Sequence, residues 1–473
     1  MHRSALFVGL AVLMVSLSLQ AAGAAATARP ADAAIVLNRQ VGPPTTQFHA
    51  NGSGFGSSEA VSISFDEVPI GRARTTSSGD FSTQTLRVPR TATPGTHTVT
   101  ASGHSSGSTA SADFLVRTDW PTFHFDAANT GFNPYENVLN ADNVSSLMPK
   151  WKTATAPGAA PDPVIAGGIV YVAPADGIVR ALNATDGSLI WSHDTGGAMS
   201  GFAPTVSGGR VYVTNEAGDA VALSASTGDQ LWSVDLGTDA MGETVADGTF
   251  YVGASDGTMT TVYALNASTG ATRWSRVADA GAQAPVSRGL LYLAALGNCS
   301  VTALDTVSGA QAWQTELCSE EVDDQQAGAA ANGALFGDFD GQSGDELEAL
   351  DATNGDVLWG EHVDPGGSPE DGAPAVAYGM VFEVNRYLWA MNATTGQTVW
   401  MNQSARTILS SPAVANGLLF LGNLGDLEAC DAITGTCPWI SRDVGAYVSS
   451  PAVADGMVFV GSQDGVVHAY GLP

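Results

Sequence analysis

The chain has 473 residues, of which 14% are charged, and its formal net charge is −29. This balance, with Lys150 and Lys152 as the only lysines, excludes partners that require clustered positive charge, namely nucleic acids and anionic membrane surfaces. The 55 glycines favour turn-rich β structure over helices, and the length allows two or three domains.

The first 28 residues have the features of a signal peptide. Arg3 precedes an apolar run from Ala5 to Leu19, and an Ala-rich stretch follows up to Ala28. The run is shorter than the ~18 apolar residues of a membrane-spanning helix, and no other stretch approaches that length. We therefore expect residues 1–28 to be removed, leaving a secreted or cell-surface protein with no transmembrane helix.

Residues 29–117 are rich in Ser, Thr and Gly and contain no Trp. Apolar and polar residues alternate at 59–66, 81–89, 96–103 and 112–117, and this period of two is typical of half-buried strands. The pattern predicts a small β-sandwich. It resembles the Ig-like modules of exported bacterial surface proteins, which implies a spacer, and no catalytic constellation is evident in it.

The rest of the chain repeats with a period of 39 to 46 residues. Seven copies resemble "ALNATDGSLIW" (181–191), with a Gly four residues before a Trp, and an eighth Trp lies upstream without this motif. The eight tryptophans are Trp151, Trp191, Trp232, Trp274, Trp313, Trp359, Trp400 and Trp439. The invariant Gly predicts a turn with positive φ or a close approach, and the Trp is expected to pack against the next unit.

A Gly-led apolar strand such as "GIVYV" (168–172) recurs eight times in phase with the Trp motif. Each unit therefore contains four short strands, the composition of a propeller blade. The eighth unit ends after three strands, whereas "MPKWKTAT" (148–155) precedes the first unit and carries the spare Trp. We predict an all-β fold in which an eight-bladed β-propeller (151–473), closed by this N-terminal strand, follows the Ig-like β-sandwich and a lead-in linker (118–150).

The repeat, written AL-[ND]-A-x-[TD]-G-x-x-x-W, resembles the tryptophan-docking repeat of the PQQ-binding-like propellers, the quinoprotein alcohol dehydrogenase superfamily. Residues 119–151 resemble the lead-in of such propellers, so the resemblance covers 119–473 and implies the fold but not the chemistry. The dehydrogenases of this superfamily hold PQQ on the axis beneath a disulfide between adjacent cysteines, with Ca²⁺ or a lanthanide beside it and an Asp as general base. This chain has no adjacent Cys pair and no CxxCH haem motif, so no catalytic or cofactor-binding residue carries over and PQQ is not expected.

The four cysteines of an exported chain predict two disulfides, for which three connectivities exist. Cys430 and Cys437 flank one repeat turn, and Cys299 and Cys318 bracket the equivalent hairpin of an earlier unit. We expect local Cys430–Cys437 and Cys299–Cys318 bonds. The spacing fits no zinc-binding pattern.

The connections opposite the repeat turns vary most around the fifth unit, where they are strongly acidic. Within "DFDGQSGDE", Asp338, Asp340 and Asp345 supply the oxygen ligands that Ca²⁺ prefers. The spacing is not that of an EF-hand, so this loop is a candidate Ca²⁺ site with a solvated hairpin as the alternative.

The superfamily includes non-enzymatic scaffolds, such as the outer-membrane assembly lipoprotein. By this resemblance we expect an exported, non-catalytic scaffold that binds a protein or ligand. We expect a monomer, whose partner is an unknown protein or surface polymer. The alternatives are a PQQ- and Ca²⁺-dependent dehydrogenase and a surface adhesin or polymer-binding module with the sandwich as its stalk.

Overall fold

The structure is a computed structural model that describes residues 32–156, 162–237, 239–256, 259–278, 284–294, 300–317, 328–338, 346–363, 372–384, 387–403, 410–423, 425–442 and 449–473. These residues form strands β1 to β43 and one turn of 3-10 helix, η1 (Val144–Ser146), which confirms the all-β class. No helix in the described ranges is long and apolar enough to cross a membrane. The signal peptide predicted at 1–28 lies outside these ranges.

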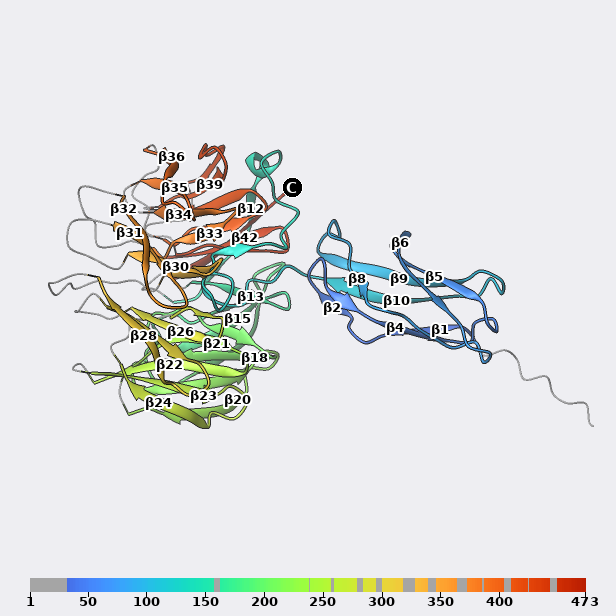
Figure 1. Ribbon diagram of the computed structural model, residues 1–473, viewed down its shortest axis with the longest axis horizontal. Helices are drawn as coiled ribbons and strands as arrows, with labels where there is room; N and C mark the ends of the chain where they lie inside the picture. Colours follow the sequence, from blue (N-terminus) through green and yellow to red (C-terminus); the bar gives the residue numbers. More distant parts are fainter. Residues whose placement is uncertain are drawn as a thin grey trace, which may run out of the picture.

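The N-terminal unit is a small, separate lobe beside the ring (Figure 1). Its strands are β1 (Ala34–Leu37), β2 (Val41–Gly42), β3 (Gln47–Phe48), β4 (Ala50–Ser53), β5 (Ala60–Phe65), β6 (Val68–Arg74), β7 (Phe81–Ser82), β8 (Leu86–Arg87), β9 (Gly95–Gly103) and β10 (Thr109–Val116). They form sheets of order β1-β4-β7, β2-β10-β9-β5-β6 and β3-β8. The expected alternation is seen in β5, where Val61, Ile63 and Phe65 are buried in the core of this unit. The Ig-like classification of the unit stays a prediction.

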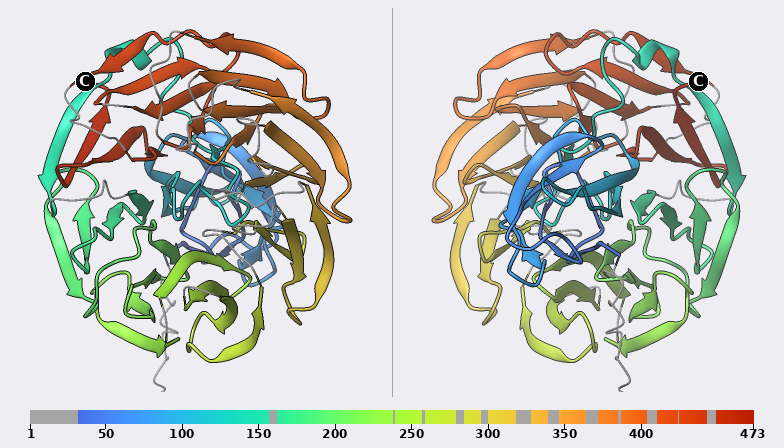
Figure 2. Two further views of the ribbon diagram at one scale, coloured as in Figure 1. Left: turned by 90° about the vertical axis from the view of Figure 1, so that its left-hand side faces the viewer. Right: turned by 90° about the vertical axis from the view of Figure 1, so that its right-hand side faces the viewer.

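The remaining strands form eight units around a common axis (Figure 2). Units 1 to 4 contain β13 (Val164–Ala166), β14 (Ile169–Val172), β15 (Ile178–Asn183) and β16 (Leu189–Asp194); β17 (Thr205–Ser207), β18 (Arg210–Thr214), β19 (Asp219–Ser224) and β20 (Gln230–Asp235); β21 (Asp239–Ala246), β22 (Thr249–Ser255), β23 (Thr260–Asn266) and β24 (Thr272–Val277); β25 (Val286–Ser287), β26 (Leu290–Ala294), β27 (Ser300–Asp305) and β28 (Gln311–Glu316). Units 5 to 7 contain β29 (Ala329–Ala331), β30 (Ala334–Asp338), β31 (Glu346–Asp351) and β32 (Val357–His362); β33 (Ala375–Ala377), β34 (Met380–Val384), β35 (Leu388–Asn392) and β36 (Thr398–Asn402); β37 (Ala413–Ala415), β38 (Leu418–Gly422), β39 (Leu427–Asp431) and β40 (Trp439–Ser441). A short strand, β11 (Phe132–Asn133), adds to unit 7 in parallel with β37.

Unit 8 joins the two ends of the propeller. It contains β41 (Ala452–Ala454), β42 (Met457–Ser462), β43 (Val466–Gly471) and, as its outer strand, β12 (Met148–Ala154). The antiparallel register between β12 and β43 runs from Met148↔Gly471 to Ala154↔Val466. The N-terminal strand therefore completes the eighth unit and removes the open edge that β43 would otherwise present.

Each repeat Trp joins its unit to the following one. The indole N–H groups donate to backbone carbonyls as follows: Trp151 to Ala184 (2.9 Å), Trp191 to Ala225 (3.0 Å), Trp232 to Ala267 (3.1 Å), Trp274 to Thr306 (3.0 Å), Trp313 to Ala352 (3.2 Å), Trp359 to Ala393 (3.2 Å), Trp400 to Ala432 (3.2 Å) and Trp439 to Leu147 (3.0 Å). The last bond reaches Leu147, directly before β12, because β12 is the outer strand of unit 8. Trp151, on β12, thus serves as the repeat Trp of unit 8.

The two faces of the ring differ. The turns from first to second strand and from third to fourth strand lie together on one face, as the bond from Ala225 N to Gly209 O (3.0 Å) illustrates. We call this the turn face, and the opposite one, with the other connections, the loop face. The N-terminal unit stands against the turn face, where Arg117 contacts Asp455 between β41 and β42. The loop face is therefore the side of the ring away from the N-terminal unit.

Residues 119–133, here called the axial segment, were predicted to be part of a linker, but they cross the centre of the ring (Figure 2). Their carbonyls accept hydrogen bonds from inner strands: Pro121 from Val206 N (2.7 Å), Ala127 from Val286 N (2.6 Å), Ala128 from Ala330 N (2.8 Å), Thr130 from Val376 N (2.8 Å) and Gly131 from Val414 N (2.7 Å). Trp120 exchanges two further bonds with Ile165 in unit 1. The inner strands have unpaired backbone groups toward the axis, and the segment satisfies them, so it is part of the core.

Side chains that follow the axial segment attach the N-terminal unit to the ring. The Glu136 carboxylate accepts from Thr118 Oγ1 (3.0 Å) and Gly456 N (3.0 Å). Asp455 accepts from Thr118 N (2.7 Å), and its other oxygen lies 3.5 Å from Arg117 Nη1. These bonds involve backbone as well as side chains, so they hold the lobe in a defined place.

We expect Asn133→Ala to lower the free energy of unfolding by about 3–5 kcal/mol, because it removes several buried hydrogen bonds at ~1 kcal/mol each and leaves their partners unsatisfied. The fully buried Asn133 amide donates to Thr118 O (2.9 Å) and Val453 O (2.8 Å) and accepts from Tyr135 N (3.0 Å). Urea unfolding measures the change. The exposed Asn354→Ala serves as control and should lower the free energy of unfolding by less than about 1 kcal/mol. Equal losses of stability in the two variants would show that the Asn133 hydrogen bonds do not stabilise the fold.

Candidate functional site on the propeller axis

One repeat position at the loop-face end of the inner strands carries an exceptional residue. The position holds Pro in five units, namely Pro163, Pro204, Pro374, Pro412 and Pro451, whereas unit 4 has Ala284, unit 5 has Gly328 and unit 3 has Glu243. The equivalence follows from the pairings Thr205↔Tyr212 and Thr244↔Tyr251, one residue further on. A carboxyl therefore replaces an apolar ring at one point around the axis.

Glu243 is buried, with only 3% of its surface exposed. Its Oε1 accepts from Thr214 N (2.8 Å) and Thr214 Oγ1 (2.5 Å), and its Oε2 has no hydrogen-bond partner among the described residues. Burial raises the pKa of Glu243 to about 8, against the two hydrogen bonds from Thr214, which lower it. The side chain is thus mainly a neutral carboxylic acid at neutral pH.

We expect the free energy of unfolding of the parent to fall relative to that of the Glu243→Gln variant as the pH rises. The folded pKa of about 8 lies above the ordinary value of 4.5, so the folded state keeps a proton that the unfolded chain releases. The bound proton of Glu243 contributes fully to the stability of the parent below about pH 4.5. This contribution is lost as pH rises toward 8, at about 1.4 kcal/mol per pKa unit. Urea unfolding from pH 5 to 9 measures it. A constant difference across that window would contradict the buried, protonated state.

A second buried carboxyl lies at the seam of the ring. Asp162, just before β13 in unit 1, accepts from Ser450 N (2.8 Å) in unit 8. Burial raises the pKa of Asp162 to about 7, although bonds from Ser450 and Ser449 lower it. Asp162 thus bridges the first and last units at the loop-face end of the inner strands, and its role there is structural.

The axial segment contributes a buried histidine. His124 stacks on Phe123 with ring centroids 4.5 Å apart, and its Nδ1 lies 3.3 Å from Asn129 O. Its Nε2 has no hydrogen-bond partner in the described part of the chain. Burial lowers the pKa of His124 to about 4, so the ring is neutral at physiological pH. A single neutral imidazole does not make a catalytic centre.

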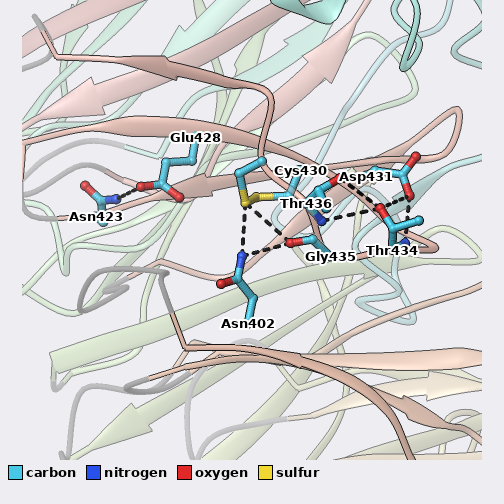
Figure 3. The surroundings of a disulfide bond; sticks show 9 residues. Asn402, Asn423, Glu428, Cys430, Asp431, Thr434, Gly435 and Thr436 are labelled. Atoms are coloured by element: carbon cyan, nitrogen blue, oxygen red, sulfur yellow. Dashed lines mark hydrogen bonds between the residues drawn. A yellow bond between two sulfur atoms is a disulfide. The ribbon is translucent and has the colours of Figure 1, made fainter.

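The structure describes one of the two predicted disulfides and only part of the predicted Ca²⁺ loop. Cys430 and Cys437 form the expected disulfide, and Asn402 Nδ2 lies 3.4 Å from Cys437 Sγ beside it (Figure 3). Cys299 and Cys318 lie outside the described residues, as do Asp340 and Asp345. The backbone of Asp338 ends β30, opposite Leu347. The second disulfide and the Ca²⁺ loop therefore stay predictions.

The comparisons with known proteins address the fold and family. The family model PQQ_2, described as outer membrane protein assembly factor BamB, matches residues 98–203, 176–292, 244–441 and 384–471. The chain belongs to this family. A curated relative, the quinohemoprotein alcohol dehydrogenase of Comamonas testosteroni, is 33% identical over 78 residues, which are 16% of this chain and 11% of that protein. The matched segment is thus a small part of the relative.

Solved propellers superpose on most of the chain. The quinohemoprotein alcohol dehydrogenase from Comamonas testosteroni has a TM-score of 0.64 at 17% identity, covering 75% of this chain and 82% of that one. BamB from Moraxella catarrhalis has a TM-score of 0.56 at 17% identity, covering 69% and 100%. A europium-containing methanol dehydrogenase has a TM-score of 0.61 at 14% identity, covering 75% and 98%. At these identities the likeness shows the propeller fold alone, which dehydrogenases and BamB share.

The donor groups of the described residues do not fit a metal-bound quinone. A Ca²⁺ ion needs several converging oxygens, and the one grouping of three potential ligands found in the described ranges is Glu428 with Cys430 and Cys437. Both thiols are consumed by the disulfide, and Asn423 Nδ2 donates to Glu428 Oε1 (3.1 Å). Glu243 already accepts two hydrogen bonds through Oε1 and holds its proton.

Glu243 and Asp162 were not predicted from the sequence. A signal for Glu243 exists, because aligning the eight units reveals Glu where five of them have Pro. Asp162 directly precedes such a Pro, and its bond to unit 8 depends on closure of the ring. Only the closed fold brings Asp162 beside Ser450, so its burial could not be read from local pattern.

Proposed function

We propose that this protein is an exported, non-catalytic propeller that binds a protein partner on its loop face. The observation that carries the proposal is the occupation of the turn face, whose centre is covered by the axial segment and the N-terminal unit. A partner approaching the axis therefore meets the loop face. Membership of a family described as an assembly factor supports a protein as the partner, and the features of residues 1–28 support export.

Charge on the loop face supports a basic partner. Asp194 and Asp235 end the outer strands of units 1 and 2, Glu216 lies in the loop between β18 and β19, and all three side chains are exposed. With a net charge of −29, the protein attracts positively charged surfaces over a distance, which raises association rates more than final affinity. The interaction is therefore expected to weaken as salt concentration rises.

Site-specific photo-crosslinking tests the face. A photo-reactive residue is placed at Glu216 on the loop face or at Asp229 in the repeat turn of the same unit, on the turn face; both positions are exposed. In cells that export the full chain, we expect a specific protein adduct from position 216 and none from position 229. An adduct from position 229 alone, or a polysaccharide adduct in place of a protein, would contradict the proposal.

Dye reduction tests the non-catalytic part of the proposal. Purified protein with added PQQ, Ca²⁺ and an alcohol is expected to leave an artificial electron-accepting dye unreduced. The same samples test the calcium loop predicted at Asp338, Asp340 and Asp345, because binding there would raise the melting temperature through mass action. Alcohol-dependent bleaching of the dye would establish the dehydrogenase instead.

A further inference from the structure

A cavity of about 350 Å³ lies where the N-terminal unit meets the turn face. We call it the junction cavity. Val41–Pro43 of the N-terminal unit form one side, residues of the axial segment form another, and β17 and β21 of units 2 and 3 complete it. Its volume falls within the range of small-molecule sites, ~300–1,000 Å³. It is separate from the loop face, so it does not depend on the proposed function.

The walls of the junction cavity are mostly apolar and partly aromatic. Phe125, Tyr135, Val206 and Val245 line it. The centroids of the Phe125 and Tyr135 rings are 6.4 Å apart, and Phe125 packs edge-on against the buried Trp120 with centroids 5.4 Å apart. The aromatic wall is thus supported from behind, which suits it to contact an apolar body or a cation.

The charged groups of the cavity leave an excess of negative charge. Asp119, Asp126 and Arg117 line it. Asp126 is engaged within the axial segment, where it accepts from Thr130 N (3.0 Å), Thr130 Oγ1 (3.0 Å) and Ala128 N (3.2 Å). Arg117 is paired with Asp455. Asp119 accepts from Gly167 N (3.2 Å) and forms no ion pair with a described residue.

The surroundings of Asp119 penalise its charge. Burial and the negative charge of Asp455 raise the pKa of Asp119 to about 6, while Gly167 N and Arg117 lower it. Burial and, after it, the negative charge of Asp119 raise the pKa of Tyr171 to about 12. A cation placed beside Asp119 would relieve this penalty, whereas an anion would add to it.

We propose that the junction cavity binds a small organic cation, with its ammonium group beside Asp119 and its apolar body against Phe125 and Tyr135. The carboxylate supplies a charge-assisted hydrogen bond, and the aromatic wall supplies apolar contact and attraction to positive charge. Since the N-terminal unit and the propeller both line the cavity, the ligand stabilises their contact when it binds.

Calorimetric titration of the full chain with phenethylammonium tests the proposal, with 2-phenylethanol as the neutral analogue. We expect saturable binding of the ammonium, with affinity about tenfold or more above that of the alcohol because the charged hydrogen bond is lost. Affinity for the ammonium is also expected to fall about tenfold at pH 5, where most Asp119 is protonated. Equal binding of both compounds, or no saturable binding of the ammonium, would overturn the proposal.

Variants locate the site. Asp119→Asn retains an oxygen for Gly167 N–H and is expected to weaken ammonium binding about tenfold and to abolish its pH dependence. Tyr135→Leu removes part of the aromatic wall, leaves the carboxyl in place and is also expected to weaken binding. If the Asp119 variant does not fold, the Tyr135 variant still tests the site. The exposed Asp142→Asn, outside the cavity lining, is the matched charge control and should leave binding unchanged. Undiminished binding by both cavity variants would place the ligand elsewhere.

Discussion

A chain lacking residues 1–155 is expected to lose cooperative unfolding and to aggregate, the largest effect predicted for this protein. The deletion removes β12, so β43 becomes an open edge with unpaired backbone groups. It also removes the acceptor of the Trp439 indole and the axial segment that pairs with the inner strands. The combined loss exceeds the ~5 kcal/mol that suffices to unfold many domains.

The control is a chain that begins at Arg117 and so keeps the axial segment and β12. It loses only the N-terminal unit, which has its own buried core, and it is expected to unfold cooperatively. Size-exclusion chromatography and thermal melting followed by Trp fluorescence compare the two chains. A shorter chain that melts as cooperatively as the longer one would show that the ring does not depend on closure by β12.

The second large effect is expected at the repeat turns, where Gly355→Ala should lower the free energy of unfolding by about 2–5 kcal/mol. Gly355 has φ +77°, which costs an L-residue ~1–2 kcal/mol. An added Cβ would also lie 2.5 Å from Trp313 Cε3 and 2.4 Å from Thr315 Oγ1. The indole is held by its bond to Ala352 O and cannot move aside freely, so overpacking adds ~1–3 kcal/mol.

Gly379→Ala separates the two causes of this loss. Gly379 has a similar φ of +74° on the same face of the ring, but nothing lies within 4 Å of its added Cβ. Only the backbone strain of ~1–2 kcal/mol is therefore expected there. The difference between the two variants, measured by urea unfolding, gives the contribution of Trp packing. Equal losses would show that the Trp adapts and that the Gly is needed for φ alone.

The repeated part of the fold could be predicted because its determinants are local and recur. The period, the Gly four residues before Trp and the truncated eighth unit led to the eight units, the Trp contacts between units and the role of β12. The units and their Trp contacts depend on neighbours about one repeat apart, and the pairing of β12 with β43 follows from counting the strands of the first and last units. The axial segment was misjudged as linker because it occurs once, and its carbonyls pair with strands up to nearly 300 residues away, as between Gly131 and Val414.

The sequence by itself determined the ring: which strands form, how units dock and how the ends meet, since periodic side chains encode contacts between adjacent units. Only the tertiary structure decided which polar groups are shielded from solvent and have shifted pKa values. Glu243 is protonated because the closed ring buries it, and Asp119 lies in a cavity because the N-terminal unit covers the turn face. Charge penalties depend on solvent exclusion by distant segments, and no local pattern of residues records that exclusion.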